Sequence, residues 1–382
     1  MIYLDNAATT KPFNEVLESF LLVNKKYYGN TASINEYGKK CKKLLELSRK
    51  QIADILKVNK ENLYFTSCAT ESNNIALIGA AMHKKDFGKH IITSKLEHPS
   101  VLEVFKFLEN FGFKVDYINV LPSGHIDIEH LKKLISKDTV LLSVMEVNNI
   151  FGAIQPIDKI IEILKDYPKV HFHVDGVQGV LKTDLDINKV DSYSLSAHKF
   201  HGLKGSGLLY IKERRNIKNI SLGGGQEDNL KSGTVNLANA VSTAKALRIY
   251  SEKVSEMNKK HYEFKKYLLE EFNKLKHVKV NSPLKKDYVN SIINISIEKI
   301  KGEAIINSLN AENIMVSTKS ACSSKKNNIN EALLSRGISD DDIKGSIRIS
   351  FSCFTRKDEL EEFIKIFKEK YKQFEEVIES GI

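Results

Sequence analysis

Apolar runs of strand length alternate with amphipathic segments of helical period between about residues 62 and 212. These runs end at Phe65, contain Ile91 and Ile92, or cover 140–144, 172–174 and 208–211. Short apolar runs bounded by polar turns are typical of strands that are buried on both faces. The alternation therefore predicts an α/β fold in which a mainly parallel sheet is covered by helices.

The pattern changes in the second half of the chain. Residues 237–275 form a long helical stretch with few breakers, which suits a connector between two domains. Short strands and helices are expected at 291–297, 303–309, 314–317 and 347–351. A long charged helix begins near Thr355. We therefore expect a large domain over 15–250, and a smaller α+β domain formed by 1–14 together with 251–382.

Composition narrows the class of protein. The chain has 382 residues, of which 42% are hydrophobic, so it can bury a large core. It opens with no leader-like pattern, and it contains no run of about 18 apolar residues, so we expect a cytoplasmic protein without a membrane partner. Four cysteines lie far apart and are expected to be reduced thiols: Cys41, Cys68, Cys322 and Cys353.

The formal charge of +10 would suit an acidic partner such as nucleic acid. The lysines, however, are spread along helical faces such as 39–50 and 365–372. A solvated surface accounts for that spread, so direct binding of nucleic acid is not expected.

Candidate chemistry gathers where the predicted strands end, which is where open parallel sheets bind ligands. The strand-like run that ends near Leu195 is followed by Ser196, Ala197, His198 and Lys199. A lysine at this position can form an imine with an aldehyde cofactor, while Ser196 and His198 can donate hydrogen bonds to a phosphate. Alone, a lysine after a strand is usually an ordinary surface residue.

The residues at two further strand ends make a functional role for Lys199 the better interpretation. Asp175 closes a strongly apolar strand and could pair with a protonated pyridine nitrogen, although an aspartate there could also cap a helix. Residues 66–72 join a strand to a helix, so backbone N–H groups and the Thr70 hydroxyl could hold a phosphate, although Thr70 could be a simple cap. An anion site, an acid and a lysine in this order favour a pyridoxal-phosphate site.

The motifs of the chain, taken together, resemble those of the cysteine desulfurases of the NifS and IscS type, within the class V aminotransferase superfamily of fold-type I. The resemblance covers nearly the whole length. It rests on YLDNAATT (3–10), ATES (69–72), EH (97–98), VNN (147–149), SAHK (196–199), GGGQE (223–227), SGT (232–234), SAC (320–322) and SIR (346–348). Several of these motifs are weak alone, but their order and spacing are specific.

The resemblance assigns roles around a pyridoxal 5'-phosphate cofactor. Lys199 would be the Schiff-base lysine and Asp175 the partner of the pyridine nitrogen, and His98 would stack on the ring as a further catalytic residue. Asn149 and Gln178 would contact the ring oxygen. The phosphate would be held by Ala69, Thr70, Ser196 and His198. Without the resemblance, His98 would be interpreted as a capping or core histidine.

Further roles implied by the resemblance concern the substrate and the assembly. Arg348, with help from Asn149, would hold the carboxylate of L-cysteine, a task suited to the planar guanidinium. Thr234 would reach the phosphate of a neighbouring subunit, which implies a homodimer. No resident metal is expected, although Cys322 could be a transient iron–sulfur ligand.

Cys322 separates the reactions that the superfamily carries out. Breaking a C–S bond requires a nucleophile that can leave with the sulfur as a persulfide, and a thiolate is suited to this. Nearby lysines would favour the thiolate, and the Ser-, Lys- and Asn-rich composition of 320–328 predicts a loop. We apply the alternative, a small buried hydrophobe, to the other three cysteines.

Departures from the family pattern and other functions stay open. The basic stretch after the GGGQE motif is replaced by Asp228 to Lys231, and Ile150, Thr31 and Lys319 stand where an acid, a proline and a glycine are common. A selenocysteine lyase or another class V enzyme would share the cofactor site. A basic scaffold or nucleic-acid-binding protein with a vestigial site is the alternative from a different class. The sulfur acceptor could be an iron–sulfur scaffold or a tRNA thiolation enzyme, or could serve thiamin synthesis.

Overall fold

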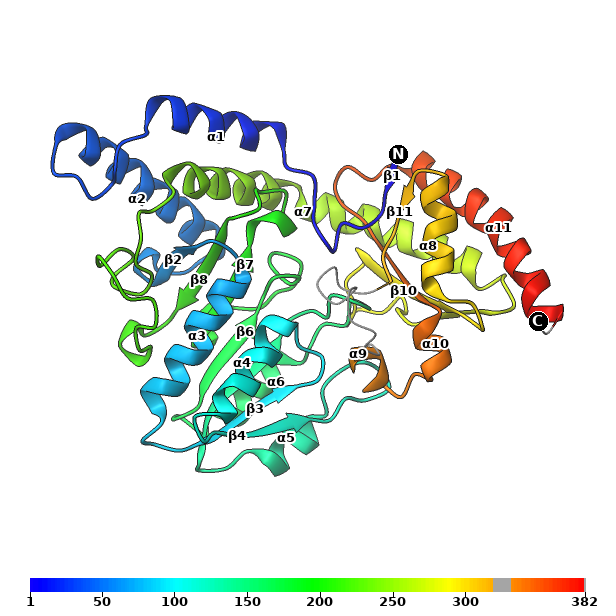
Figure 1. Cartoon of the computed structure of the whole chain (residues 1–382), viewed down its shortest axis with the longest axis horizontal. Helices are drawn as coiled ribbons and strands as arrows, with labels where there is room; N and C mark the ends of the chain where they lie inside the picture. Colours follow the sequence, from blue (N-terminus) through cyan, green and yellow to red (C-terminus); the bar gives the residue numbers. More distant parts are fainter. Residues whose placement is uncertain (319–330, 381–382) are drawn as a thin grey trace.

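The computed structural model describes residues 1–318 and 331–380, and a seven-stranded sheet dominates it (Figure 1). In spatial order the strands are β2 (Leu63–Thr66), β8 (Gly207–Ile211), β7 (Ser192–Ser196), β6 (His171–Asp175), β5 (Thr139–Met145), β3 (His90–Ser94) and β4 (Lys114–Ile118). β8 alone runs in the opposite direction to the other six strands of this sheet. The mainly parallel α/β fold predicted from the sequence is confirmed.

Helices cover both faces of this sheet, which explains why its central strands are continuous apolar runs. On one face α3 (Ala69–Lys84) and α4 (Pro99–Glu109) bury Ile75 and Phe105 against Leu141 of β5. The other face is covered by several helices: α1 (Asn14–Lys26), α2 (Glu36–Leu56), α5 (Ile128–Leu134) and α6 (Ile157–Leu164). All seven residues of β5 are buried, as expected for a strand at the centre of three layers.

A second hydrophobic core lies to the right of the sheet in Figure 1. It is built on the antiparallel strands β12 (Ser346–Ser350), β10 (Ile292–Ile297) and β9 (Val278–Val280), and on the parallel pair β1 (Ile2–Tyr3) and β11 (Ile314–Met315). The helices α8 (Gly302–Ala311) and α11 (Lys357–Ser380) pack on it, and α9 (Glu331–Leu334) and α10 (Asp340–Lys344) lie beside it. The exact domain boundaries proposed from the sequence stay a prediction.

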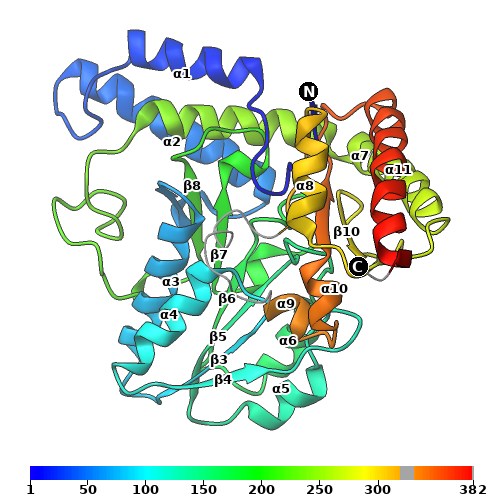
Figure 2. The same cartoon turned by 45° about the vertical axis from the view of Figure 1, so that its right-hand side comes forward.

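One helix, α7 (Leu237–Phe272), belongs to both cores. Its 36 residues extend for about 54 Å at the usual rise of an α-helix. Asn236 accepts a hydrogen bond from the Asn239 N–H and caps its first turn. The first half of α7 packs against α1 and α2, whereas Leu268 and Phe272 lie in the second core (Figures 1 and 2). The connector expected over 237–275 is therefore present as a single helix.

The sequence did not indicate every element. The edge strand β4 was missed because only its last residue is buried, so polar residues interrupt its sequence and it has no continuous apolar run. Within the described residues, α9 is a single helical turn of 4 residues. Among the helices of 1–318 and 331–380, none is both long and apolar enough to cross a membrane.

Candidate active site

The largest grouping of predicted site residues lies in one pocket at the carboxyl ends of β5, β6 and β7. The pocket encloses about 160 Å³. Ten residues proposed from the sequence line it: Ala69, Thr70, His98, Asn149, Asp175, Gln178, Ser196, His198, Lys199 and Arg348. The parallel register brings these strand ends to one edge of the sheet, since Met145 is level with Asp175, and Asp175 with Ser194.

Lys199 ends a short 3₁₀ turn (Ala197–Lys199) that directly follows β7. Its Nζ atom donates to the carbonyl oxygens of Ala7 and Ala8, at 2.7 and 2.8 Å. The amine is therefore held against the N-terminal segment while it faces the pocket. An amine in this position can form a covalent bond with an aldehyde.

Asp175 ends β6 and is almost fully buried. Its Oδ1 accepts from the N–H of Val177 at 3.1 Å, and its Oδ2 accepts from the side-chain amide of Asn73 at 3.0 Å. The residues that follow Asp175 form turns rather than a helix, so the helix-cap interpretation does not describe this position. The carboxylate instead faces the pocket and can pair with a cationic ring nitrogen.

The N-terminus of α3 opens at the pocket wall, where residues 66–72 were expected to hold a phosphate. Cys68 is the N-cap residue and makes no side-chain capping bond, and Ala69 and Thr70 open the helix at the pocket wall. First-turn amides have no partner within a helix, and the helix dipole favours an anion there. An anion would be stabilised at this position, and the phosphate contact expected of Thr70 stays a prediction.

His198 lies near this anion site. Burial, with added effects of Lys199 and Lys204, lowers the pKa of His198 to about 4. The imidazole is therefore neutral near pH 7, and its Nδ1 lies 3.2 Å from the Thr9 hydroxyl. A neutral imidazole can still donate one hydrogen bond to a phosphate oxygen.

His98 caps a helix, as one of its two interpretations had it, and its stacking on a cofactor ring stays a prediction. It is the N-cap residue of α4, where its Nδ1 accepts from the Ser100 N–H at 3.2 Å, and it also lines the pocket. Burial lowers the pKa of His98; Asp175 acts in the opposite direction, and Lys199 lowers it further. The ring is therefore neutral and fixed in orientation where it faces the pocket.

Arg348 lies on β12 and is only 1% exposed. Its Nη2 atom donates to Asp5 Oδ1 at 2.7 Å, and its Nη1 atom donates to the carbonyl oxygen of Asn149 at 2.9 Å. Its Nε atom is buried and has no hydrogen-bond partner among residues 1–318 and 331–380. A buried N–H without a partner is costly, so this group suits a carboxylate ligand that enters the pocket.

Sequence reasoning missed several residues that shape the pocket. Ala7 and Ala8 were part of a recognised motif but had no role, and their carbonyl oxygens hold Lys199. Gln178 Nε2 also donates to the Ala7 carbonyl oxygen, at 2.9 Å. Asp5 comes from the same motif and holds Arg348. The motif was the available signal, but the pairing of Asp5 with Arg348 joins residues 343 positions apart.

Two predicted residues are not in this pocket. Thr234 lies in a separate hollow that is also lined by Phe65, Gly205 and Lys231. Its expected role toward a neighbouring subunit stays a prediction. Cys322 lies outside the described residues, so its role as sulfur acceptor also stays a prediction.

The pocket residues fit pyridoxal phosphate on the geometry alone. An amine, a buried carboxylate and a helix N-terminus surround one cavity, which matches an aldehyde, a ring nitrogen and a phosphate. His98 can lie against a flat ring. The buried Nε of Arg348 then remains for a substrate carboxylate.

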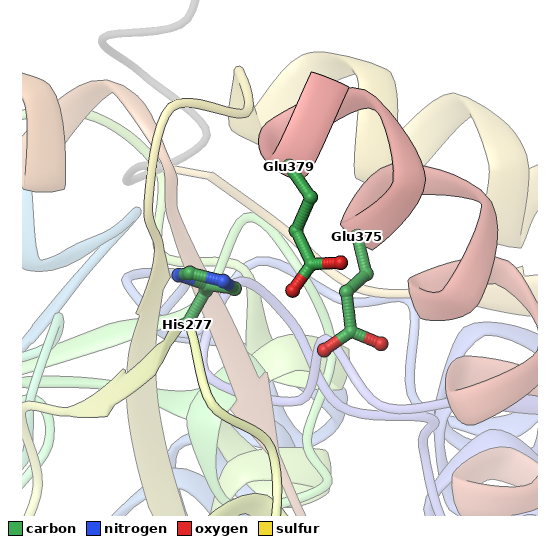
Figure 3. A group of neighbouring side chains, drawn as sticks. All are labelled: His277, Glu375 and Glu379. Carbon is green, nitrogen blue, oxygen red and sulfur yellow. The ribbon is translucent and has the colours of Figure 1, made fainter. Parts of the chain in front are cut away.

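A second group of ionisable side chains lies away from the pocket, where α11 meets the start of β9 (Figure 3). Its members are His277, Glu375 and Glu379. Glu375 accepts from the Tyr371 hydroxyl at 3.1 Å, Glu379 pairs with Lys276 at 3.2 Å, and His277 Nδ1 lies 3.1 Å from Glu298. Each of the three side chains has a protein partner, so we interpret the group as polar contacts that hold α11 in place.

Comparison with protein families gives a match to the aminotransferase class V model over residues 2–363. A protein of Lactobacillus delbrueckii subsp. bulgaricus described as a NifS/IcsS protein homolog is 43% identical over 384 residues, which cover 100% of both chains. The cysteine desulfurase IscS of Dictyoglomus turgidum is 38% identical over 94% of this chain and 91% of its own length.

Solved structures agree with these matches. A NifS-like protein superposes with a TM-score of 0.91 and 34% identity, covering 97% of this chain and 99% of its own. The structure of SspA in complex with cysteine superposes with a TM-score of 0.81 and 29% identity over 92% of this chain and 99% of its own.

Proposed function

This chain belongs to the class V aminotransferase family, and from that premise we propose how its own residues carry out a cysteine desulfurase reaction. The protein is a pyridoxal-phosphate-dependent cysteine desulfurase, as its IscS and NifS-like relatives indicate. The observation that supports the residue roles best is the meeting of Lys199, Asp175, the α3 N-terminus and Arg348 around one cavity.

The first part of the proposal concerns the cofactor. Lys199 would hold the aldehyde carbon and Asp175 the ring nitrogen, and the phosphate would lie at the α3 N-terminus beside Ser196 and His198. Bound pyridoxal phosphate supplies a ring that withdraws electrons from the α-carbon of an attached amino acid. Asn149 and Gln178 would contact the ring oxygen, since both line the cavity.

The second part concerns L-cysteine. The Nε atom of Arg348 would donate to the substrate carboxylate, because it is buried and no described residue accepts a hydrogen bond from it. Asp5 and the Asn149 carbonyl oxygen keep the guanidinium in place. The amine of Lys199 and the imidazole of His98 lie on the same cavity and would move protons to and from the substrate.

The third part is sulfur transfer. The Cys322 thiolate would attack the sulfur of the substrate, so that the substrate's C–S bond breaks while a new S–S bond forms at Cys322. The carbon that loses sulfur takes a proton, and alanine leaves. One cysteine and one thiol thus become one alanine and one persulfide, with no external oxidant needed.

The sulfur's destination and the assembly are also proposed. We infer a homodimer, because Thr234 would serve a neighbouring subunit's phosphate rather than the pocket of its own chain. An acceptor protein would take the persulfide sulfur, either an iron–sulfur scaffold or a tRNA thiolation enzyme. The scattered cysteines support a reducing, cytoplasmic setting.

The test uses the purified holoenzyme with L-cysteine and a reducing thiol. We expect equal amounts of alanine and sulfide. Brief reaction without the thiol, followed by mass spectrometry, should find one extra sulfur atom on the peptide that contains Cys322. Cys322→Ser should bind the cofactor normally and make neither product, whereas Cys353→Ser is the matched control and should keep activity. An extra sulfur on Cys68 or Cys353 instead would refute the assignment of Cys322.

A further inference from the structure

A chain of buried polar side chains runs behind the pocket, from β6 to the start of α4. Its members are His171, Ser192, His173, Asn73, Ser100 and His98, with a branch to Asp175. His173, Ser192 and Asn73 are fully buried. Asn73 connects two parts of the site, because its amide contacts both Asp175 and Ser100.

The direction of each hydrogen bond in this chain follows from Asp175. Its carboxylate only accepts hydrogen bonds, so the Asn73 atom 3.0 Å from Oδ2 must be the NH₂ group. The amide oxygen of Asn73 then faces His173 Nε2 at 3.0 Å, and that nitrogen must carry a proton. Burial lowers the pKa of His173 to about 3, so the ring is neutral and its Nδ1 is bare.

The remaining donors are fixed in turn. The Ser192 hydroxyl, 2.8 Å from His173 Nδ1, must donate to it, and His171 Nε2 donates to Ser192 at 2.8 Å. The second amide hydrogen of Asn73 points to the Ser100 oxygen at 2.9 Å. The Ser100 hydroxyl therefore directs its own hydrogen to His98 Nδ1, 2.9 Å away.

We propose that Asn73 is a positioning residue for the desulfurase reaction, because its one amide holds the Asp175 carboxylate and, through Ser100, fixes His98 as the tautomer with its proton on Nε2. This inference rests on the function proposed above. His98 then presents an N–H donor to the pocket, since its Nδ1 accepts from both the hydroxyl and the N–H of Ser100. All donors in the chain point toward the pocket, an arrangement in which hydrogen bonds strengthen one another.

Charged groups from other elements also face His98. Asp175 on β6 favours its protonated form, and Lys199 after β7 opposes it. Arg348 on β12 lines the same pocket. Loss of the Ser100 hydroxyl would leave these charges unchanged. It would therefore make Nδ1 of His98 easier to protonate.

The first experiment compares two readouts in the holoenzyme. Asn73→Ala should move the pH midpoint of the bound cofactor's visible absorption upward by about one unit, because Asp175 loses a donor. It should also lower kcat/KM about tenfold and move the acid limb of its pH profile upward. Ser100→Ala should move only the pH profile and leave the absorption midpoint unchanged. Ser100→Thr keeps the hydroxyl and should restore the wild-type profile.

The matched control is Asn74→Ala, on the same helix, where the amide only donates to the Thr70 carbonyl oxygen at 2.8 Å. It should leave both readouts at wild-type values. An Asn73→Ala protein with unchanged midpoint and pH profile would overturn the proposal, as would a Ser100→Ala protein whose absorption midpoint shifts equally. The absorption titration contains no cysteine, so a protein that makes no sulfide would contradict the proposed function without affecting this test.

A second measurement needs no variant of Asn73 and applies if Asn73→Ala does not fold. Nitrogen-15 spectra of the imidazoles in the unsubstituted holoenzyme, assigned with single histidine variants, report which nitrogen carries the proton. We expect neutral rings protonated on Nε2 for both His98 and His173. A proton on Nδ1 of either ring would overturn the inference.

Discussion

The two sides of the pocket are built in different ways. The cofactor side comes from consecutive parts of one sheet, where Asp175 ends one parallel strand and Lys199 follows the end of the next. The substrate side joins the two ends of the chain, because Arg348 of β12 is held by Asp5. The cofactor side therefore depends on local strand–turn geometry, and the substrate side depends on the packing of the second core.

The difference suggests that the two sides can be damaged independently. Changes on the cofactor side should alter cofactor binding and every later step. Changes on the substrate side should spare the cofactor and weaken only the handling of cysteine. The four predictions below test this separation, from the largest expected effect to the smallest.

The strongest test replaces Lys199. Lys199→Ala should remove covalent attachment of the cofactor and lower kcat at least about a thousandfold, because Lys199 supplies the only amine among the described residues that line the pocket. Reduction of the wild-type holoenzyme with borohydride, followed by peptide mapping, should locate the cofactor on Lys199. The exposed Lys204→Ala serves as the control and should behave as wild type. A cofactor adduct on Lys182 or Lys204 would place the site elsewhere.

Arg348→Lys should break the substrate side alone. The variant keeps the positive charge but loses the planar fork, so kcat/KM for L-cysteine should fall about a hundredfold, mostly through KM. The visible spectrum of the bound cofactor should not change. Arg336→Lys makes the same substitution where the guanidinium contacts the Pro122 carbonyl oxygen and should leave kinetics unchanged. Unchanged kinetics in Arg348→Lys would remove this residue from the substrate site.

The cofactor side should also be the more sensitive to acid. Burial lowers the pKa of His171 to about 4 and of His173 to about 3, from 6.5 in both cases. The unfolded chain then binds more protons below pH 6.5, so stability falls as pH drops from about 6.5 toward these folded values. His173 alone should account for on the order of 2 kcal/mol at about pH 5.

Chemical denaturation at a series of pH values measures this loss. His173→Gln should have lower stability at neutral pH but a shallower decline with acid, since it lacks the group that titrates. An equally steep decline in both proteins would mean that other groups cause the acid sensitivity.

Asp5→Asn should have the smallest effect. The substitution keeps the shape and leaves an acceptor for Arg348, but it removes the negative charge 2.7 Å from Nη2. We expect about a tenfold loss in kcat/KM with unchanged cofactor absorption. Steady-state kinetics beside the absorption spectrum measures both. A change in the spectrum as large as the change in kinetics would show that the two sides are not separable.

The sequence was enough to bring together the residues on the cofactor side of the pocket, because their signals are local. Lys199, Asp175 and Thr70 each follow an apolar strand, and strand ends of a parallel sheet meet at one edge. The sequence was less informative about partners that meet only through tertiary packing. Neither Asp5 nor Arg348 carries a local signal for their ion pair.

Asn73 shows a second limit of sequence reasoning. An asparagine within a helix is usually interpreted as a surface residue, because the protein core rarely contains amides without hydrogen-bond partners. Here the amide is completely buried and all its partners come from other elements, namely β6 and α4. Polar groups whose partners are distant in the chain leave no periodic pattern, so only the folded structure reveals them.

The helix α7 has a mechanical consequence for the enzyme. It contains neither glycine nor proline, the residues at which helices most readily kink, and it is packed into both cores. Any rotation of one core against the other must therefore bend α7 and strain its backbone hydrogen bonds. We expect the two cores to move as a single rigid unit during turnover. The distance between Lys199 and Arg348 should then be the same before and after substrate binding. This fixed distance should limit the length of the amino acids that the pocket accepts.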